Sequence, residues 1–337
     1  VGERIDARGR IILPGLVNCH THLPMAMFRG MADDLPLDVW LNEHIFPAEA
    51  RMVNPDSVEK WSLHACDEML LAGTTTCCDG YFHEDAVARG VDRAGIRAVL
   101  AQGVIDFPAP GVPDPAQNVE TARQFVLETR GLSSRIYPSI FCHSPYTCSA
   151  RTLTSARQAA RELDVLFQIH AAETRKEAGM IQGIGDSSVI AWLDELGILG
   201  HKTLLVHAVW VDGADIDLIS GSGTGVAHCP ESNMKLASGI CPAHDLVRAG
   251  VALGLGTDGC ASNNDLDLFG EMDTAAKLQK VACMDPCALD ARTVVRAATI
   301  QGARALGLEN DIGSIAPGKR ADLILVDTRA PHMTPLF

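Results

Sequence analysis

The chain has few basic residues and no apolar run long enough to cross a membrane. Lys and Arg number 28 against 42 Asp and Glu, which gives a formal net charge of −14 and a pI near 5.2. This balance argues against a nucleic-acid partner, because neutralising phosphates requires a basic surface. A membrane span needs about 18 consecutive apolar residues, and neither such a run nor a signal-peptide pattern occurs. We therefore expect a cytoplasmic protein with no membrane partner.

Cysteine pairs with the spacing of a metal finger are also lacking. Eleven cysteines is an odd number, and several lie singly in apolar segments, as Cys66, Cys142 and Cys229 do. Cys283 and Cys287 form one pair, with no second pair to complete a zinc finger. The pattern is typical of the reduced, buried thiols of a cytosolic protein.

A glycine-rich phosphate loop is missing after the first predicted strand, although strands and helices alternate along the chain. Eight short, mostly apolar runs fit parallel strands that are covered on both faces: residues 15–22, 73–80, 96–104, 136–143, 165–170, 203–210, 224–229 and 251–258. Amphipathic helix patterns lie at 57–72, 116–130, 151–163, 187–197, 242–249 and 264–281. The alternation predicts a (β/α)8 TIM-type barrel, since an open doubly wound sheet would usually carry such a loop.

The barrel is expected to occupy residues 14–306. Residues 313–327 (GSIAPGKRADLILVD) lie beyond it and are typical of a turn at Pro317-Gly318 followed by a strand. We therefore expect this part of the chain to belong to a small satellite β unit.

Histidine and aspartate recur at the ends of the predicted strands. His20 and His22 share one face of the first strand, because residues i and i+2 of a strand point the same way. Further strand ends carry His143, His170, His207, His228 and Asp258. Barrel enzymes build their sites at these carboxyl ends. Burying several imidazoles and a carboxylate in one barrel mouth requires a compensating partner, and a divalent cation is the natural one.

Three neutral imidazoles and one carboxylate suit Zn2+ or a similar metal, with a position left for water. We predict His20, His22, His170 and Asp258 as ligands of one divalent ion, expected to be Zn2+, with Fe2+ and Mn2+ as alternatives. Asp258 can also accept the proton of the activated water. Glu173 is predicted as a proton shuttle, and His207 as a group that orients hydroxide or stabilises charge.

The segments PGLVNCHTH, IHAAET, LLVHA and GLGTDGCASNNDLDLFGEM resemble the amidohydrolase superfamily. Within it they are similar to the 5′-methylthioadenosine/S-adenosylhomocysteine deaminases and to the related triazine chlorohydrolases, over roughly residues 10–327. The resemblance implies metal-dependent hydrolytic deamination of an adenine nucleoside at C6, giving the inosine analogue and ammonia. It also implies a small-molecule nucleoside substrate, a homo-oligomer, and a partial β-sandwich of which residues 1–13 and 307–337 would be remnants.

The resemblance also carries substrate residues over. Trp40 and Glu49 would cover the nucleoside, with Glu49 accepting hydrogen bonds from the ribose hydroxyls. His143 would contact the purine or ribose, Ser262 would lie near the base, and Arg135 matches an arginine of the family. Relatives that accept the homocysteine tail carry an arginine in the loop after the third strand. Here that loop, residues 106–116, has no basic residue, which predicts a preference for methylthioadenosine or adenosine unless Arg135 substitutes.

Other functions need the same activated water. An s-triazine chlorohydrolase or aminohydrolase is the first alternative, and the metal site alone does not separate it from a nucleoside deaminase. Glu173 favours deamination because ammonia leaves protonated, whereas chloride does not. Glu49 favours a ribose, which a free guanine or cytosine lacks. A catalytically silent scaffold is the least favoured, since every expected ligand is present.

Overall fold

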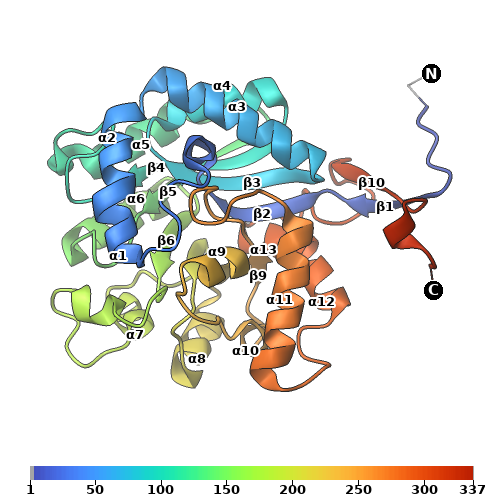
Figure 1. The fold of residues 1–337 in the computed structure, drawn as a ribbon. Coiled ribbons are helices and arrows are strands. Elements are labelled where there is room, and N and C mark those ends of the chain that lie inside the picture. Colours follow the sequence, from blue (N-terminus) through green and yellow to red (C-terminus); the bar gives the residue numbers. More distant parts are fainter. Residues whose placement is uncertain (1–3, 337) are drawn as a thin grey trace.

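The computed structural model describes residues 4–336, and its centre is the closed barrel that the alternation predicts (Figure 1). Eight parallel strands pair in chain order, and β2 pairs with β9 to close the ring. Each strand overlaps one of the eight predicted runs: β2 (Leu16–Thr21), β3 (Thr74–Tyr81), β4 (Arg97–Val104), β5 (Ile136–Cys142), β6 (Phe167–Ala171), β7 (Thr203–His207), β8 (Gly225–His228) and β9 (Leu253–Leu255).

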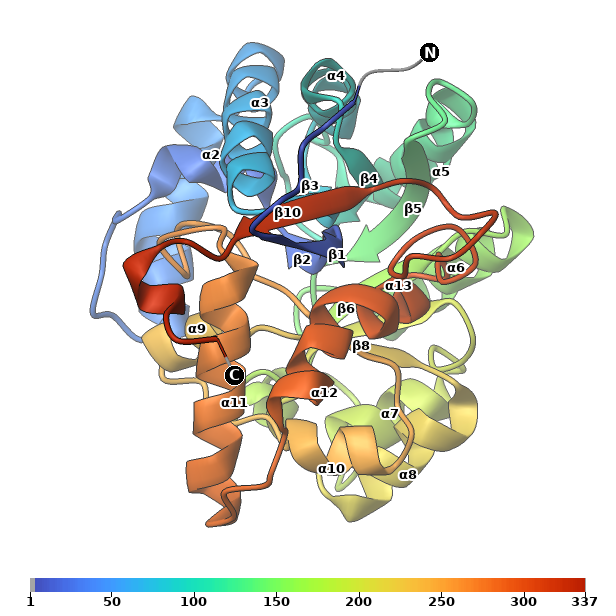
Figure 2. The same ribbon diagram turned by 90° about the vertical axis from the view of Figure 1, so that its right-hand side faces the viewer.

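Helices surround the barrel (Figure 2). All six predicted helices are present, among α3 (Pro55–Leu71), α4 (Glu84–Ala94), α5 (Asn118–Thr129), α6 (Ala150–Glu162), α7 (Val189–Glu195), α8 (Gly213–Ser222), α9 (Pro230–Lys235), α10 (Ala243–Arg248), α11 (Leu268–Cys283), α12 (Ala291–Arg296) and α13 (Gly302–Ala305). Helix α3 shows how the local sequence determines where a helix begins. Asn54 and Ser57 exchange side-chain and backbone hydrogen bonds in a capping box, and Pro55 occupies the first helical position.

The strands are buried on both faces. Every residue of β2, β4, β6, β7, β8 and β9 is buried. Side chains fill the inside of the barrel while the helices cover its outside, which explains why the strands are almost continuously apolar in sequence. The imidazole and carboxylate side chains inside the barrel are therefore the informative ones.

Residues 37–52, which we call the outer segment, connect the first strand to α3. The segment contains α1 (Leu37–Val39), a π-helical turn η2 (Trp40–Ile45) and α2 (Phe46–Met52). In Figure 1 α1 and α2 lie at the end of the barrel away from β1 and β10. Inserted π-turns of this kind are frequent at functional sites.

At the other end of the barrel, β1 (Arg10–Pro14) pairs antiparallel with β10 (Leu323–Asp327). The strand β10 lies within residues 313–327, where the sequence predicts a turn followed by a strand. The division at residue 306 and the β-sandwich origin of this two-stranded sheet stay predictions. Residues 1–3 and 337 of the predicted terminal segments lie outside the described residues. Within residues 4–336, no helix has both the length and the apolar character that a membrane crossing requires.

Candidate active site

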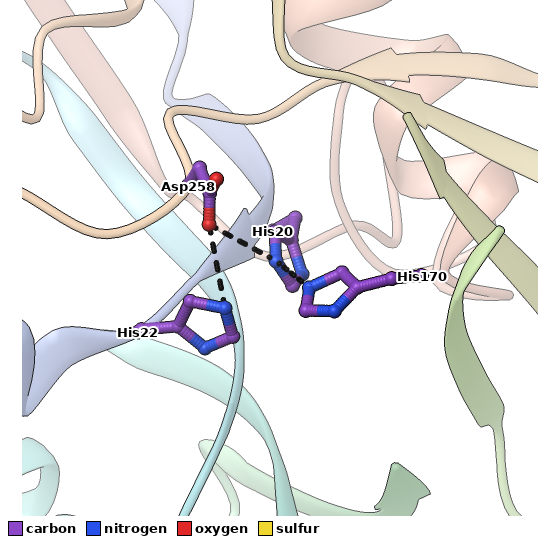
Figure 3. A group of neighbouring side chains, drawn as sticks. All are labelled: His20, His22, His170 and Asp258. Carbon is purple, nitrogen blue, oxygen red and sulfur yellow. Dashed lines mark hydrogen bonds and ion pairs between the residues drawn. The ribbon is translucent and has the colours of Figure 1, made fainter. Parts of the chain in front are cut away.

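The four predicted metal ligands meet inside the carboxyl end of the barrel (Figure 3). His20 lies in β2 and His22 directly after it, His170 lies in β6, and Asp258 follows β9. One donor atom from each side chain lies within 4.8 Å of the others. The Asp258 Oδ1 atom is 3.4 Å from His20 Nε2 and 3.3 Å from His22 Nε2. Four residues that are far apart in sequence therefore form one compact donor set.

Hydrogen bonds behind the donor set fix how its members point. His22 Nδ1 donates to the Gly80 carbonyl oxygen at 2.6 Å, which leaves the His22 Nε2 lone pair facing the cluster. Asp258 Oδ2 accepts from the Ser232 hydroxyl at 2.7 Å and from the Ser262 hydroxyl at 2.9 Å. The carboxylate is thereby held with Oδ1 turned toward the imidazoles.

The chemistry of the cluster fits a divalent cation. The Nε2 atoms of His20 and His170 are 3.0 Å apart. Burial lowers the pKa of His20 to about 4 and that of His170 well below its ordinary value. Neutral imidazoles have lone pairs on these nitrogens if their protons are on Nδ1, and two lone pairs this close repel unless a cation lies near them. A carboxylate completes a donor set that suits Zn2+.

The backbone at the strand ends is strained where it carries the site. Ala172, His207, Ala208 and Asp258 all have positive φ angles, between 46° and 75°. Such conformations cost non-glycine residues of order 1–3 kcal/mol each and occur at functional sites. Gly256 is required nearby, because a Cβ there would lie 2.9 Å from the Cβ of His20. The barrel end is thus shaped for its side chains at some cost in stability.

Glu173 and His207 lie beside the donor set. The Glu173 Oε2 atom is 3.8 Å from His207 Nε2, and the His207 ring centroid is 5.2 Å from that of His170. Burial raises the pKa of Glu173, while the nearby His207 acts in the opposite direction. A buried carboxyl group with a raised pKa can hold a proton near neutral pH, as a proton shuttle must.

Two further residues hold this pair in place. The Glu177 carboxylate accepts the backbone N–H groups of Ala172 and Glu173, at 3.0 and 2.7 Å. Asn233 Oδ1 lies 2.9 Å from His207 Nδ1, so that His207 Nε2 faces the cavity. Glu177 and Asn233 therefore orient the two catalytic candidates from behind.

A cavity that is partly open to solvent extends from the cluster to the outer segment. Its inner end contains His22, His170, Glu173, His207 and Asp258. Its walls are mostly apolar or aromatic and are formed by Met25, Leu37, Trp40, Leu41, Ile45, Phe46, Tyr81, Phe82, Val104, Ile105, Phe141, Tyr146 and Leu236. A deep, mainly apolar cavity with a few polar groups is typical of a small-molecule site.

The predicted substrate residues Trp40, Glu49, His143 and Ser262 all line this cavity. Trp40 and Glu49 come from the outer segment, where both are buried. The His143 ring is 5.2 Å from that of His170 and 6.2 Å from that of Phe46, so it lies between the cluster and the outer segment. Ser262 differs from the expectation in one respect, because its hydroxyl already donates to Asp258.

Arg135 is not part of the cavity, and the prediction of a substrate contact is wrong for this structure. It directly precedes β5, at the amino end of the barrel strands, whereas the cavity lies at their carboxyl ends. Its guanidinium pairs with Asp92 at 2.7 Å, and 37% of its side chain is exposed. Among the described residues that line the cavity there is no lysine or arginine.

Tyr81 and Glu177 are among the polar residues of the site that the sequence analysis did not name. Tyr81 is the last residue of β3, and its hydroxyl donates to Glu49 Oε1 at 2.5 Å. It could have been found, because it occupies a carboxyl strand end like the other site residues. Glu177 gives no such signal, since only the folded turn after β6 brings its carboxylate under the backbone of Glu173.

Comparisons with known proteins agree with this arrangement. Residues 11–337 match the family model described as Amidohydrolase family. The chain is 46% identical to a 5′-deoxyadenosine deaminase of Methanothermobacter thermautotrophicus, over 98% of this chain and 77% of that protein. It is also 46% identical to a 5-methylthioadenosine/S-adenosylhomocysteine deaminase of Syntrophobacter fumaroxidans, over 99% of this chain and 76% of the relative.

A solved structure is similar over almost the whole fold. An adenosine deaminase from Xanthomonas campestris with bound zinc superposes with a TM-score of 0.94 and is 43% identical in sequence. The match covers 97% of this chain and 74% of that one. The barrel and its carboxyl end are therefore shared with a protein whose structure contains zinc.

Proposed function

Because the chain belongs to the amidohydrolase family, we propose that it is a metal-dependent hydrolase that removes the amino group at C6 of an adenine nucleoside. The products are the inosine analogue and ammonia. The observation that carries the proposal is one cavity that is lined both by members of the donor set with Glu173 and His207 and by Glu49. The names of the relatives and of the zinc-containing structure support it.

His20, His22, His170 and Asp258 would hold the cation. When bound, a divalent cation acidifies a water molecule and so supplies a nucleophile at neutral pH. Asp258 is a buried member of the donor set, and its Oδ1 atom, which faces the imidazoles, can accept the proton of the water molecule. The hydroxyls on Oδ2 keep this orientation during proton transfer.

Glu173 would move the proton that deamination needs. Its protonated carboxyl group can donate its proton to a ring nitrogen of the purine. The resulting carboxylate can then take a proton from the hydroxyl group added to the ring and deliver it to the departing amine. Ser238 donates to Glu173 Oε1 at 3.3 Å, which leaves Oε2 facing His207 and the cavity. His207, whose Nδ1 faces Asn233 Oδ1, would present Nε2 to the attacked carbon, where a protonated imidazole can donate a hydrogen bond to the negative charge that develops on the oxygen.

Glu49 would bind the ribose hydroxyls, and the apolar walls would enclose the base and a small 5′ group. Glu49 would therefore distinguish a nucleoside from an s-triazine or a free base, because neither of these has a diol that could donate hydrogen bonds to the carboxylate. The absence of lysine and arginine among the described lining residues supports a preference for methylthioadenosine, 5′-deoxyadenosine or adenosine over S-adenosylhomocysteine.

The donor set supports Zn2+ as the metal, with Fe2+ and Mn2+ as alternatives. The cysteines among the described residues are free thiols, nine of the eleven buried, which supports the proposal of a reducing, cytoplasmic setting. A homo-oligomer stays a prediction from the family resemblance.

One assay tests the proposal. Metal-replete protein is incubated with methylthioadenosine, 5′-deoxyadenosine, adenosine, S-adenosylhomocysteine and an aminotriazine, while ammonia release and the adenine-to-hypoxanthine absorbance change are followed. Turnover of the adenine nucleosides with little turnover of the triazine is the expected result. Turnover of the triazine alone would contradict the nucleoside assignment, and a protein that binds no stoichiometric metal and turns over none of the substrates would favour the silent scaffold.

A further inference from the structure

Glu49 is a buried carboxylate without a cationic partner. Only 5% of the residue is exposed, and the lining of its cavity contains no lysine or arginine among the described residues. A buried carboxylate needs hydrogen bonds or an opposite charge to remain ionised. Within the part of the chain that the structure describes, the Tyr81 hydroxyl is the one side-chain donor to Glu49, at 2.5 Å from Oε1.

Tyr81 is well placed to act on Glu49 because it belongs to the rigid barrel. It ends β3 and is 4% exposed, whereas Glu49 lies on the short helix α2 of the outer segment. Its ring packs 5.3 Å from that of Phe82 and 6.1 Å from that of His22, measured between ring centroids. The hydrogen bond therefore connects β3, a strand of the barrel, to the outer segment, which would bind the ribose.

We propose that Tyr81 is a positioning residue for substrate binding: its hydroxyl holds Glu49 Oε1 and keeps the carboxylate as an acceptor for the ribose hydroxyls. This inference rests on the proposed function, in which Glu49 binds the ribose. An ionised carboxylate accepts hydrogen bonds on both oxygens, whereas a protonated one donates on one of them. Because Tyr81 occupies one acceptor site of Oε1, Oε2 remains free to face the substrate.

The electrostatics of Glu49 support this role. Burial raises the pKa of Glu49 to about 7, and the hydrogen bond from Tyr81 acts in the opposite direction. The other titratable groups around the same space are His22, His143, His170, Glu173, His207 and Asp258 in this cavity, His83 in the adjoining one, and Arg51 on α2 itself. Loss of the tyrosine hydroxyl therefore moves the pKa of Glu49 upward and leaves more of it protonated at neutral pH.

The test compares Tyr81→Phe with the wild type on a matched pair of substrates, adenosine and 2′,3′-dideoxyadenosine. Removing one hydrogen bond to a charged group predicts an increase in KM for adenosine of about tenfold, with little change in kcat. The acid limb of the kcat/KM profile for adenosine moves to higher pH. The KM for the dideoxy substrate, which has no hydroxyls for Glu49, changes by no more than about twofold.

Two further variants make the result specific. Tyr137→Phe removes a tyrosine hydroxyl outside the cavity, which accepts a hydrogen bond from the Arg97 guanidinium, and leaves KM and the pH profile unchanged. In a Glu49→Gln background, which has no group to titrate at this position, Tyr81→Phe produces no further pH shift, as a double-mutant cycle requires for two coupled residues.

The outcomes separate this inference from the proposed function. A Tyr81→Phe enzyme with the KM and pH profile of the wild type overturns the role of Tyr81 while the deaminase assignment stands. An equal rise in KM for both substrates also overturns it, because that result indicates a general distortion of the cavity. A wild type that turns over no adenine nucleoside overturns both.

Discussion

The inner end of the cavity and its outer wall are built in different ways. At the inner end, the donor set comes from the ends of β2, β6 and β9, and each ligand's orientation is set by strand pairing or by hydrogen bonds behind it. At the outer wall, Trp40 and Glu49 come from three short helical turns between residues 37 and 52. Among residues 4–336, Glu49 has a single side-chain hydrogen bond, from Tyr81.

Because of this difference, the inner end and the outer wall of the cavity have different roles in the reaction. Strand ends in a closed barrel are held from both sides, so they can position a metal and proton-transfer groups within the tolerance that chemistry requires. A segment between elements is easier to vary, and such segments determine which substrate fits. Substitutions at the inner end should therefore abolish the reaction, whereas those at the outer wall should change which nucleoside is bound.

The largest expected effect follows from Asp258→Asn. An amide replaces the one anionic member of the donor set, so the protein should lose its stoichiometric metal, and activity should fall by about a thousandfold or more. Metal analysis of the purified protein and ammonia release measure the two losses. Asp92→Asn, a change at the exposed ion pair with Arg135, is the matched control and should keep both. A full equivalent of metal in Asp258→Asn would contradict the assigned donor set.

Glu173→Gln should separate chemistry from metal binding at the same end. The amide cannot carry the proton, and loss of general acid–base catalysis predicts a fall in kcat of about 10²–10⁴-fold with metal content unchanged. Steady-state kinetics and metal analysis measure both quantities. The control is Glu162→Gln on the surface, where Glu162 pairs with Arg123. If KM rose and kcat stayed constant, Glu173 would be a binding residue instead.

The same difference explains what could be predicted from the sequence. The eight strands and the donor set followed from apolar runs and from polar residues at their ends, because strand periodicity and barrel closure determine where such residues go. Glu49 was assigned through a family resemblance, since a glutamate in a helical segment is usually a solvated surface group. Arg135 was carried over from the family resemblance, although its position just before the strand predicted at 136–143 put it at the amino end of the barrel. Tyr81 lies at a carboxyl strand end and could have been found there, whereas the role of Glu177 depends on a tertiary contact that no local pattern encodes.

The preference of the outer wall for one 5′ group of the nucleoside over another is expected to be smaller than the effects of Asp258→Asn and Glu173→Gln. The loop after β4 places Phe107 in the space that adjoins the cavity beside Glu49, with its ring 5.4 Å from that of Phe46, and supplies no cation for a homocysteine carboxylate. The kcat/KM for methylthioadenosine should exceed that for S-adenosylhomocysteine by about tenfold, the value of one favourable ion pair in a partly buried site.

Phe107→Arg should reduce that ratio, and Phe107→Leu, which removes the ring without adding charge, is the control. Competition between the two substrates at equal concentration measures the ratio directly. Equal rates in the wild type would mean that a cation is not needed for the tail, and the argument from residues 106–116 would be wrong.

The smallest effect is expected from Arg135→Ala, and it tests whether the two ends of the barrel are independent. Arg135 pairs with Asp92 at the surface, and exposed pairs of this kind contribute about 0–1 kcal/mol to stability. The KM values for methylthioadenosine and S-adenosylhomocysteine should each change by less than about twofold, because nothing connects this side chain to the cavity. A selective loss of S-adenosylhomocysteine turnover would require Arg135 to reach a substrate that this structure keeps at the opposite end of β5. The preference between 5′ groups would then depend on a different arrangement of the chain. Residues other than those of the outer wall would also determine which substrate is bound.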